Sequence, residues 1–183
     1  MSTAATTLNL ATTLDHHVRL APATEAVVMG DRRLTYAQLH TLTGKVATAL
    51  RGLGLRPGDH VALTCPNVPY FPIAYFGILR AGCVVVPLNV LLKPREIAYH
   101  LKDSDAKAYF CFEGTPELPM AAWGREAVAQ APECRHFVVL TIDPMAPSGP
   151  DGARSLAALL APAAAAAAAE PRRPEDTAVI LYT

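Results

Sequence analysis

The feature that most constrains the fold is a strand-helix-strand pattern in the first half of the chain. Residues 60–65 and 83–88 are short apolar runs rich in aliphatic side chains, which predicts two strands. Between them, residues 68–79 carry no charge and give about three helical turns. Gly82 follows this segment closely, as glycine commonly follows a helix.

The second strand predicts a parallel sheet, because residues 83–86 contain no polar side chain. A strand that is apolar on both faces has to be covered on both faces, so helices are expected above and below the sheet. The helix between the strands is apolar nearly all round and is expected to lie between two layers. Ligands of open parallel sheets bind beyond the carboxyl ends of the strands. Asn67, Asn89 and Lys93 follow those ends, although capping and solvation explain them better than ligand binding.

Helices and strands alternate through the rest of the chain. Gly30-Asp31 predicts a tight hairpin. Thr35 and Gln38 have the spacing of a capping box that begins a helix. Further helices are predicted at residues 8–20, 120–131 and 155–160, and another is predicted to begin at residues 94–96. Further strands are predicted at 107–112 and 136–141. The fold class is therefore α/β, a doubly wound and mostly parallel sheet flanked by helices.

The charge balance argues against nucleic acid as a partner. Lysine plus arginine and aspartate plus glutamate number 16 each, so there is no overall field to attract an anionic polymer. No basic segment precedes apolar residues at the amino terminus, and no apolar run approaches about 20 residues. We therefore expect no transmembrane segment and a cytoplasmic protein.

The cysteines and histidines do not suggest a metal site. Cys65, Cys83, Cys111 and Cys134 lie far apart without zinc-ligand spacing, and three of them lie in apolar runs. We expect them to be buried, reduced thiols. The neighbouring His16 and His17 are expected to be exposed helix residues.

The composition of the last part of the chain suggests how the protein is divided into a subdomain, a linker and a final strand. We expect residues 1–162 to form an α/β subdomain and the alanine- and proline-rich residues 163–176 to form a surface linker. Residues 177–182, TAVILY, predict another fully apolar strand that ends next to Thr183. A buried parallel strand has to be followed by a turn and a crossover, so this polypeptide is expected to be the amino-terminal part of a larger, here incomplete, fold.

Three segments together resemble the adenylate-forming superfamily, which includes acyl-CoA and aryl-CoA synthetases. The segment LTYAQL at residues 34–39 is similar to the family's LTYxEL, with glutamine in place of glutamate. Residues 79–89, LRAGCVVVPLN, are similar to L(K/R)AGxxxxPL(D/N). Residues 176–183, DTAVILYT, resemble the approach to the phosphate loop YTSGTTGxPKG, of which only Tyr182 and Thr183 are present. The resemblance extends from about residue 8 to residue 183 and is greatest to fatty acyl-CoA ligases.

This resemblance implies a ligase that uses ATP, magnesium and coenzyme A. A carboxylic acid, here a fatty acid, is first converted to an acyl-adenylate and then to a thioester. Thr183 is the one residue whose role carries over, as a group that faces phosphate or magnesium. The remaining family motifs lie past residue 183, so we expect this polypeptide alone to be inactive and assign it no catalytic residue.

Two alternatives stay open from the sequence. One is a non-catalytic α/β binding or dimerisation module, in which an uncovered apolar strand recruits a partner and a homodimer forms. The other is a ligase of the same superfamily that acts on an aryl or short-chain acid.

Overall fold

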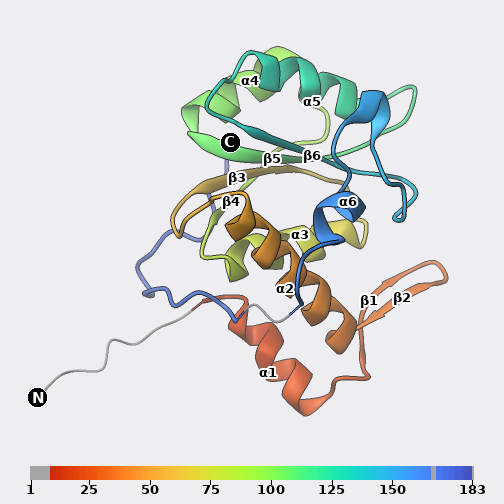
Figure 1. The fold of residues 1–183 in the computed structure, drawn as a ribbon, viewed down its shortest axis with the longest axis vertical. Coiled ribbons are helices and arrows are strands. Elements are labelled where there is room, and N and C mark those ends of the chain that lie inside the picture. The colour runs from red at the N-terminus through yellow and green to blue at the C-terminus, as the bar shows by residue number, and fades with distance from the viewer. Residues whose placement is uncertain (1–8, 166–167, 183) are drawn as a thin grey trace, which may run out of the picture.

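The computed structural model describes residues 9–165 and 168–182 (Figure 1). The helices are α1 (Thr12–Leu20), α2 (Tyr36–Gly52), α3 (Tyr70–Arg80), α4 (Pro94–Asp103), α5 (Met120–Ala129), α6 (Leu156–Leu160) and the short 3-10 helix η1 (Pro150–Gly152). The strands are β1 (Glu25–Met29), β2 (Arg32–Thr35), β3 (His60–Thr64), β4 (Val84–Pro87), β5 (Ala106–Phe112) and β6 (His136–Leu140). None of the helices described is long and apolar enough to cross a membrane.

The centre of the molecule is a parallel sheet with the strand order β4-β3-β5-β6. Side chains from alternate positions divide between two cores, as the period of a strand requires. Val61, Leu63 and Phe110 pack toward α2, α3 and α6, whereas Ala62 and Tyr109 pack toward α4 and α5. The predicted doubly wound α/β architecture is confirmed, with helices on both faces of the sheet (Figure 1).

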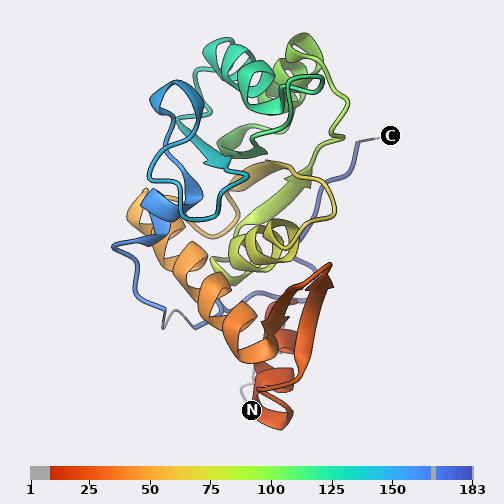
Figure 2. The ribbon, with the colours of Figure 1, turned by 90° about the vertical axis from the view of Figure 1, so that its right-hand side faces the viewer.

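The strand-helix-strand pattern is confirmed in β3, α3 and β4. Helix α3 contacts both strands as well as α2, so it lies between layers as its apolar surface predicts. Gly77 makes the close approach of α2 and α3 feasible, because a Cβ at this position would lie 2.5 Å from Cβ of Val46. The predicted hairpin is also present, with β1 and β2 antiparallel beside the start of α2 (Figure 2).

Local hydrogen bonds fix the beginnings of two helices. At α2, the Gln38 amide donates to the Thr35 hydroxyl, at 3.2 Å, and the Thr35 amide donates to the Gln38 side chain, at 2.8 Å. This is the predicted capping box. At α4, the carboxylate of Glu96 accepts from the backbone amide of Lys93, at 2.7 Å, next to the first-turn Pro94.

Arg80, at the end of α3, is buried, with a side chain 1% exposed. Its guanidinium contacts the carboxylate of Asp15 in α1. The same carboxylate lies 2.9 Å from Nε2 of His40 in α2. A residue that the sequence suggested only as a helix terminus therefore connects three helices.

The described part of residues 163–176 has no helix or strand and lies along α2. The Thr48 hydroxyl donates to the carbonyl of Ala164, at 2.9 Å. A Cβ at Gly44 would lie 2.1 Å from the carbonyl oxygen of Ala165. The chain therefore crosses α2 at a glycine, where no side chain blocks its close approach. Further on, Arg51 pairs with Glu170 at 3.3 Å. The segment thus packs against the α/β core. The expected division of the chain at this segment stays a prediction.

Candidate functional site

The segment 177–182 approaches the expected site along the outer edge of β4. The Val85 amide donates to the carbonyl of Ala178, at 2.9 Å, and the Ile180 amide donates to the carbonyl of Val85, at 3.0 Å. Val179 and Val85 form a parallel bridge. The segment therefore runs parallel to β4 at the edge of the sheet.

The segment forms one isolated bridge and not the full strand that the sequence predicts. In a parallel ladder, the next hydrogen bond toward the carboxyl end requires the backbone amide of residue 87. Pro87 has no such amide, so the ladder stops there. The same proline is the last residue of β4.

The segment is also less buried than its apolar sequence predicts. Ile180 and Tyr182 pack against the core beneath α4 and α5, whereas Leu181 is 70% exposed. Within the described residues, no second strand pairs with the outer edge of this segment. The outer edge of the segment is therefore unpaired within the described residues, and the exposed Leu181 shows that the segment is not covered on both faces.

Tyr182 is held by two residues of α4. Its hydroxyl donates to Oδ2 of Asp103, at 2.8 Å, and its ring centroid lies 4.3 Å from that of His100. Burial, followed by the bond to Asp103 and its negative charge, raises the pKa of Tyr182 to about 12. These contacts fix the residue immediately before Thr183, which lies outside the described residues.

The other candidates at the strand ends have local roles. Oδ1 of Asn89 accepts from the amide of Leu91, at 2.9 Å, and so stabilises a turn. The ammonium of Lys93 lies 3.7 Å from the ring centroid of Trp123, a cation-π contact that the sequence did not suggest. Asn67 is exposed in the loop after β3. The structure does not bring these three side chains together with Tyr182 in one described cavity.

Sequence reasoning missed an apolar cleft of about 680 Å³ between the β1–β2 hairpin and the carboxyl ends of β5 and β6. We call it the hairpin cleft. Its apolar wall includes Leu34, Leu42, Ile73, Phe112, Ile142 and Leu160. These residues come from separate elements, so no local sequence motif predicts the cleft. The only sequence signal was the general rule that ligands bind beyond the carboxyl ends of parallel strands.

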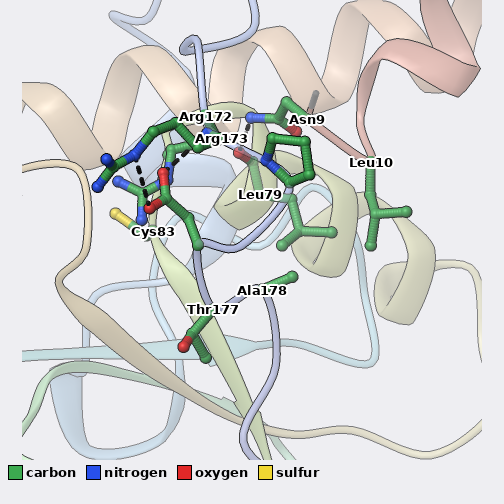
Figure 3. Close-up of a pocket in the computed structure, with 11 residues that line it drawn as sticks. Asn9, Leu10, Leu79, Cys83, Arg172, Arg173, Thr177 and Ala178 are labelled. Atoms are coloured by element: carbon green, nitrogen blue, oxygen red, sulfur yellow. Dashed lines mark hydrogen bonds and ion pairs between the residues drawn. The ribbon is translucent and has the colours of Figure 1, made fainter. Parts of the chain in front are cut away.

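A smaller cavity of about 230 Å³ lies at the opposite, amino-terminal end of β4 (Figure 3). Asn9, Leu79 and Cys83 line it together with the segment that precedes residue 178. The amide of Asn9 donates to the carbonyl of Leu79, at 2.7 Å, and Arg172 pairs with Asp176, at 3.3 Å. Asn9, Arg172 and Asp176 are thus paired within the protein, so the cavity is best explained as part of the packing of residues 9–10 and 172–178 against α3.

The four cysteines are free and buried, as predicted. Burial raises the pKa of each thiol to about 12. Among residues 9–165 and 168–182, no group of three or more histidine, cysteine, aspartate or glutamate side chains is arranged to hold a metal ion. The described residues therefore do not provide a magnesium site.

Comparisons with a family model and with known proteins agree on the family to which this chain is similar. Residues 14–183 match the family described as AMP-binding enzyme. The long-chain-fatty-acid–CoA ligase of Escherichia coli O6:H1 is 47% identical over 76 residues, 41% of this chain and 14% of that protein. The fatty acid–[acyl-carrier-protein] ligase ScoC of Streptomyces coeruleorubidus is 37% identical over 101 residues, 55% of this chain and 20% of that protein.

Comparison of structures also finds a CoA ligase with a similar fold. The crystal structure of the anthranilate CoA ligase AuaEII, in complex with anthranoyl-AMP, superposes with a TM-score of 0.84 at 25% sequence identity. The superposition covers 97% of this chain and 31% of that one. The chain thus spans less than a third of the length of these relatives.

Proposed function

The chain belongs to the AMP-binding enzyme family, and from this premise we propose that it is part of an ATP-dependent fatty acyl-CoA ligase. In the proposed reaction, a fatty acid carboxylate attacks the α-phosphate of ATP, which gives an acyl-adenylate and releases pyrophosphate. The thiolate of coenzyme A then attacks the acyl carbonyl carbon, and AMP leaves. The substrate class is supported by the identity to the E. coli ligase.

The observation that carries the proposal is the docking of residues 177–182 beside β4. It brings the backbone to Tyr182 at the edge of the sheet, and Tyr182 is the first of the two residues that resemble the beginning of the family's phosphate-binding loop. We propose that the Thr183 hydroxyl faces phosphate or magnesium. The anchoring of Tyr182 by Asp103 and His100 supports this, because a fixed entry preorganises the loop that follows.

We propose that the protein acts in the cytoplasm and uses ATP, magnesium and coenzyme A. The four free, buried thiols fit a reducing compartment. The 183 residues contain only Tyr182 and Thr183 of the phosphate-loop motif, and the described residues hold no metal-binding cluster. We therefore propose that this polypeptide is inactive by itself.

Fatty-acid-dependent exchange of pyrophosphate into ATP tests the function in two arms. The 183-residue polypeptide alone should show no exchange above a protein-free control. A chimera that joins residues 1–183 to the remaining sequence of the E. coli ligase should show exchange with hexadecanoate. A chimera that is folded and binds ATP, yet shows no exchange with any acid tested, contradicts the proposal. Exchange by the 183-residue polypeptide contradicts the proposed inactivity.

An aryl acid is a second candidate substrate, favoured by the similarity to the anthranilate CoA ligase structure. The protein thiol of an acyl carrier protein is likewise a second candidate acceptor, favoured by the similarity to ScoC. A natural form of the protein that carries the phosphate loop distinguishes these. Exchange with benzoate or anthranilate exceeding that with hexadecanoate favours the aryl acid.

We also propose that the polypeptide forms a homodimer through the outer edge of residues 177–182. Unpaired sheet edges recruit further strands, and Leu181 is exposed here. Light scattering after size exclusion tests this proposal. A mass that stays monomeric at every concentration argues against the dimer.

A further inference from the structure

The hairpin cleft has the size and chemistry of a small-molecule site. Its volume of about 680 Å³ falls within the range of roughly 300–1,000 Å³ that is usual for ligand pockets. Its wall combines aliphatic side chains of α2, α3 and α6 with the ring of Phe112 at the end of β5. Such a surface favours a ligand with a long hydrocarbon part.

The polar groups of the cleft lie at the hairpin and at the start of α3. Arg32 and Arg33 line it from β2, and Tyr70 lines it from α3. Arg33 is occupied, since its guanidinium lies 3.4 Å from the carboxylate of Glu25. The side chain of Arg32 forms no hydrogen bond or ion pair with any described residue, so its charge is available to a ligand.

The charge of Arg32 acts at the position of Tyr70. Burial raises the pKa of the Tyr70 hydroxyl, while a hydrogen bond with Thr141 and the charge of Arg32 lower it. Asp143 acts in the opposite direction with a smaller effect than Arg32. The charge of Arg32 thus reaches the part of the cleft that Tyr70 lines.

We propose that the hairpin cleft is an accessory site for a fatty acid, with the hydrocarbon tail along the apolar wall and the carboxylate beside Arg32. The site is separate from the one to which Thr183 leads. Phe112 is the last residue of β5 and Ile142 follows β6, whereas residues 177–182 lie beside β4 at the other edge of the sheet. The choice of a fatty acid among amphiphilic anions rests on the proposed function, and the cation and the apolar wall support it independently.

Direct binding tests the site without requiring catalysis. The fluorescent fatty acid cis-parinaric acid is titrated into the 183-residue polypeptide and then displaced by saturated acids of increasing length, below their micelle concentrations. We expect one saturable site, with affinity rising by up to roughly fourfold for each methylene that the cleft buries. A folded polypeptide that shows no saturable binding, or binding that is independent of chain length, overturns the proposal.

Matched variants locate the ligand. Arg32→Ala should weaken binding of the acid at least fivefold and leave binding of the alcohol of equal length unchanged, because the alcohol has no charge. Arg95→Ala removes an exposed arginine of α4, outside the cleft, and should change neither. Equal losses in the Arg32 and Arg95 variants, or equal losses of acid and alcohol in Arg32→Ala, overturn the assignment of the carboxylate.

Two further variants place a bulky side chain in the cleft, each from a different helix. Leu42→Trp in α2 and Ala157→Trp in α6 should each weaken binding at least tenfold, while Leu91→Trp, outside the cleft, should not. Circular dichroism establishes that each variant is folded. If both blocked variants are folded and bind normally, the cleft is not the site. Pyrophosphate exchange by the chimera is measured separately, so loss of the accessory site and failure of the ligase function are distinguishable.

Discussion

The buried guanidinium of Arg80 contacts the carboxylate of Asp15, which lies 65 positions earlier in the chain. Arg80 is 1% exposed and Asp15 is 23% exposed, so the pair is largely removed from water. Removing the carboxylate of such a pair takes away part of the stabilisation of a buried charge. Asp15→Asn should therefore lower the free energy of unfolding by about 3 kcal/mol, as measured by urea denaturation.

The matched control for this pair is Glu25→Gln, which removes an exposed partner of Arg33. Exposed ion pairs contribute about 0–1 kcal/mol, so this change should have little effect. Similar losses in the two variants would show that the Asp15–Arg80 contact does not hold α1 against α3.

The close contact of α2 and α3 depends on the small residue at position 77. Gly77→Ala places a methyl group against Val46 and should destabilise the fold by about 1–3 kcal/mol. The double variant with Val46→Ala should recover part of the loss introduced by Gly77→Ala. In Gly52→Ala, by contrast, the new methyl group has open space, and stability should rise by up to about 1 kcal/mol. Thermal unfolding compares the series, and equal effects at positions 52 and 77 would contradict this packing.

The cysteine thiols should be inert while the protein is folded. Burial raises the pKa of each to about 12, so almost no thiolate is present at pH 8. A disulfide reagent such as Ellman's should label none of the four in buffer and all four in denaturant. Fast labelling in buffer, with retained circular dichroism, would contradict the burial of the thiols.

Tyr182 should make stability depend on pH in alkaline solution. Its pKa is raised from 10.0 to about 12 in the folded protein, so the folded state binds the phenolic proton more tightly than the unfolded state. The resulting stabilisation is complete below pH 10 and is lost as the pH rises through about 12. Unfolding of the parent and of Tyr182→Phe between pH 9 and 12 measures this contribution. The difference between them should decline over that window, and a constant difference would contradict the contact with Asp103.

Local sequence predicted the features that depend on neighbours in the chain. The hairpin at Gly30 and the capping box of Thr35 and Gln38 are formed within a few residues and appear as expected. The strand-helix-strand unit follows from the period of apolar residues, and the parallel sheet follows from strands without polar positions.

Contacts between distant segments were not predictable in this way. The Arg80–Asp15 pair depends on the relative position of α1 and α3, and the hairpin cleft requires several elements to converge. The shortened pairing of residues 177–182 depends on a missing amide in the neighbouring strand, at Pro87. Pattern in one segment carries no information about such partners, so only the tertiary fold reveals them.

The central claim is that residues 177–182 dock in parallel beside β4 and so direct the chain toward the phosphate loop. Amide hydrogen exchange, resolved residue by residue by NMR, tests it most directly. The amides of Ile180 and Val85 donate across this junction, whereas the amide of Leu181 donates no hydrogen bond within the described residues. The account predicts strong protection of Ile180 and Val85 and fast exchange at Leu181. Exchange of Ile180 as fast as that of Leu181 would contradict it.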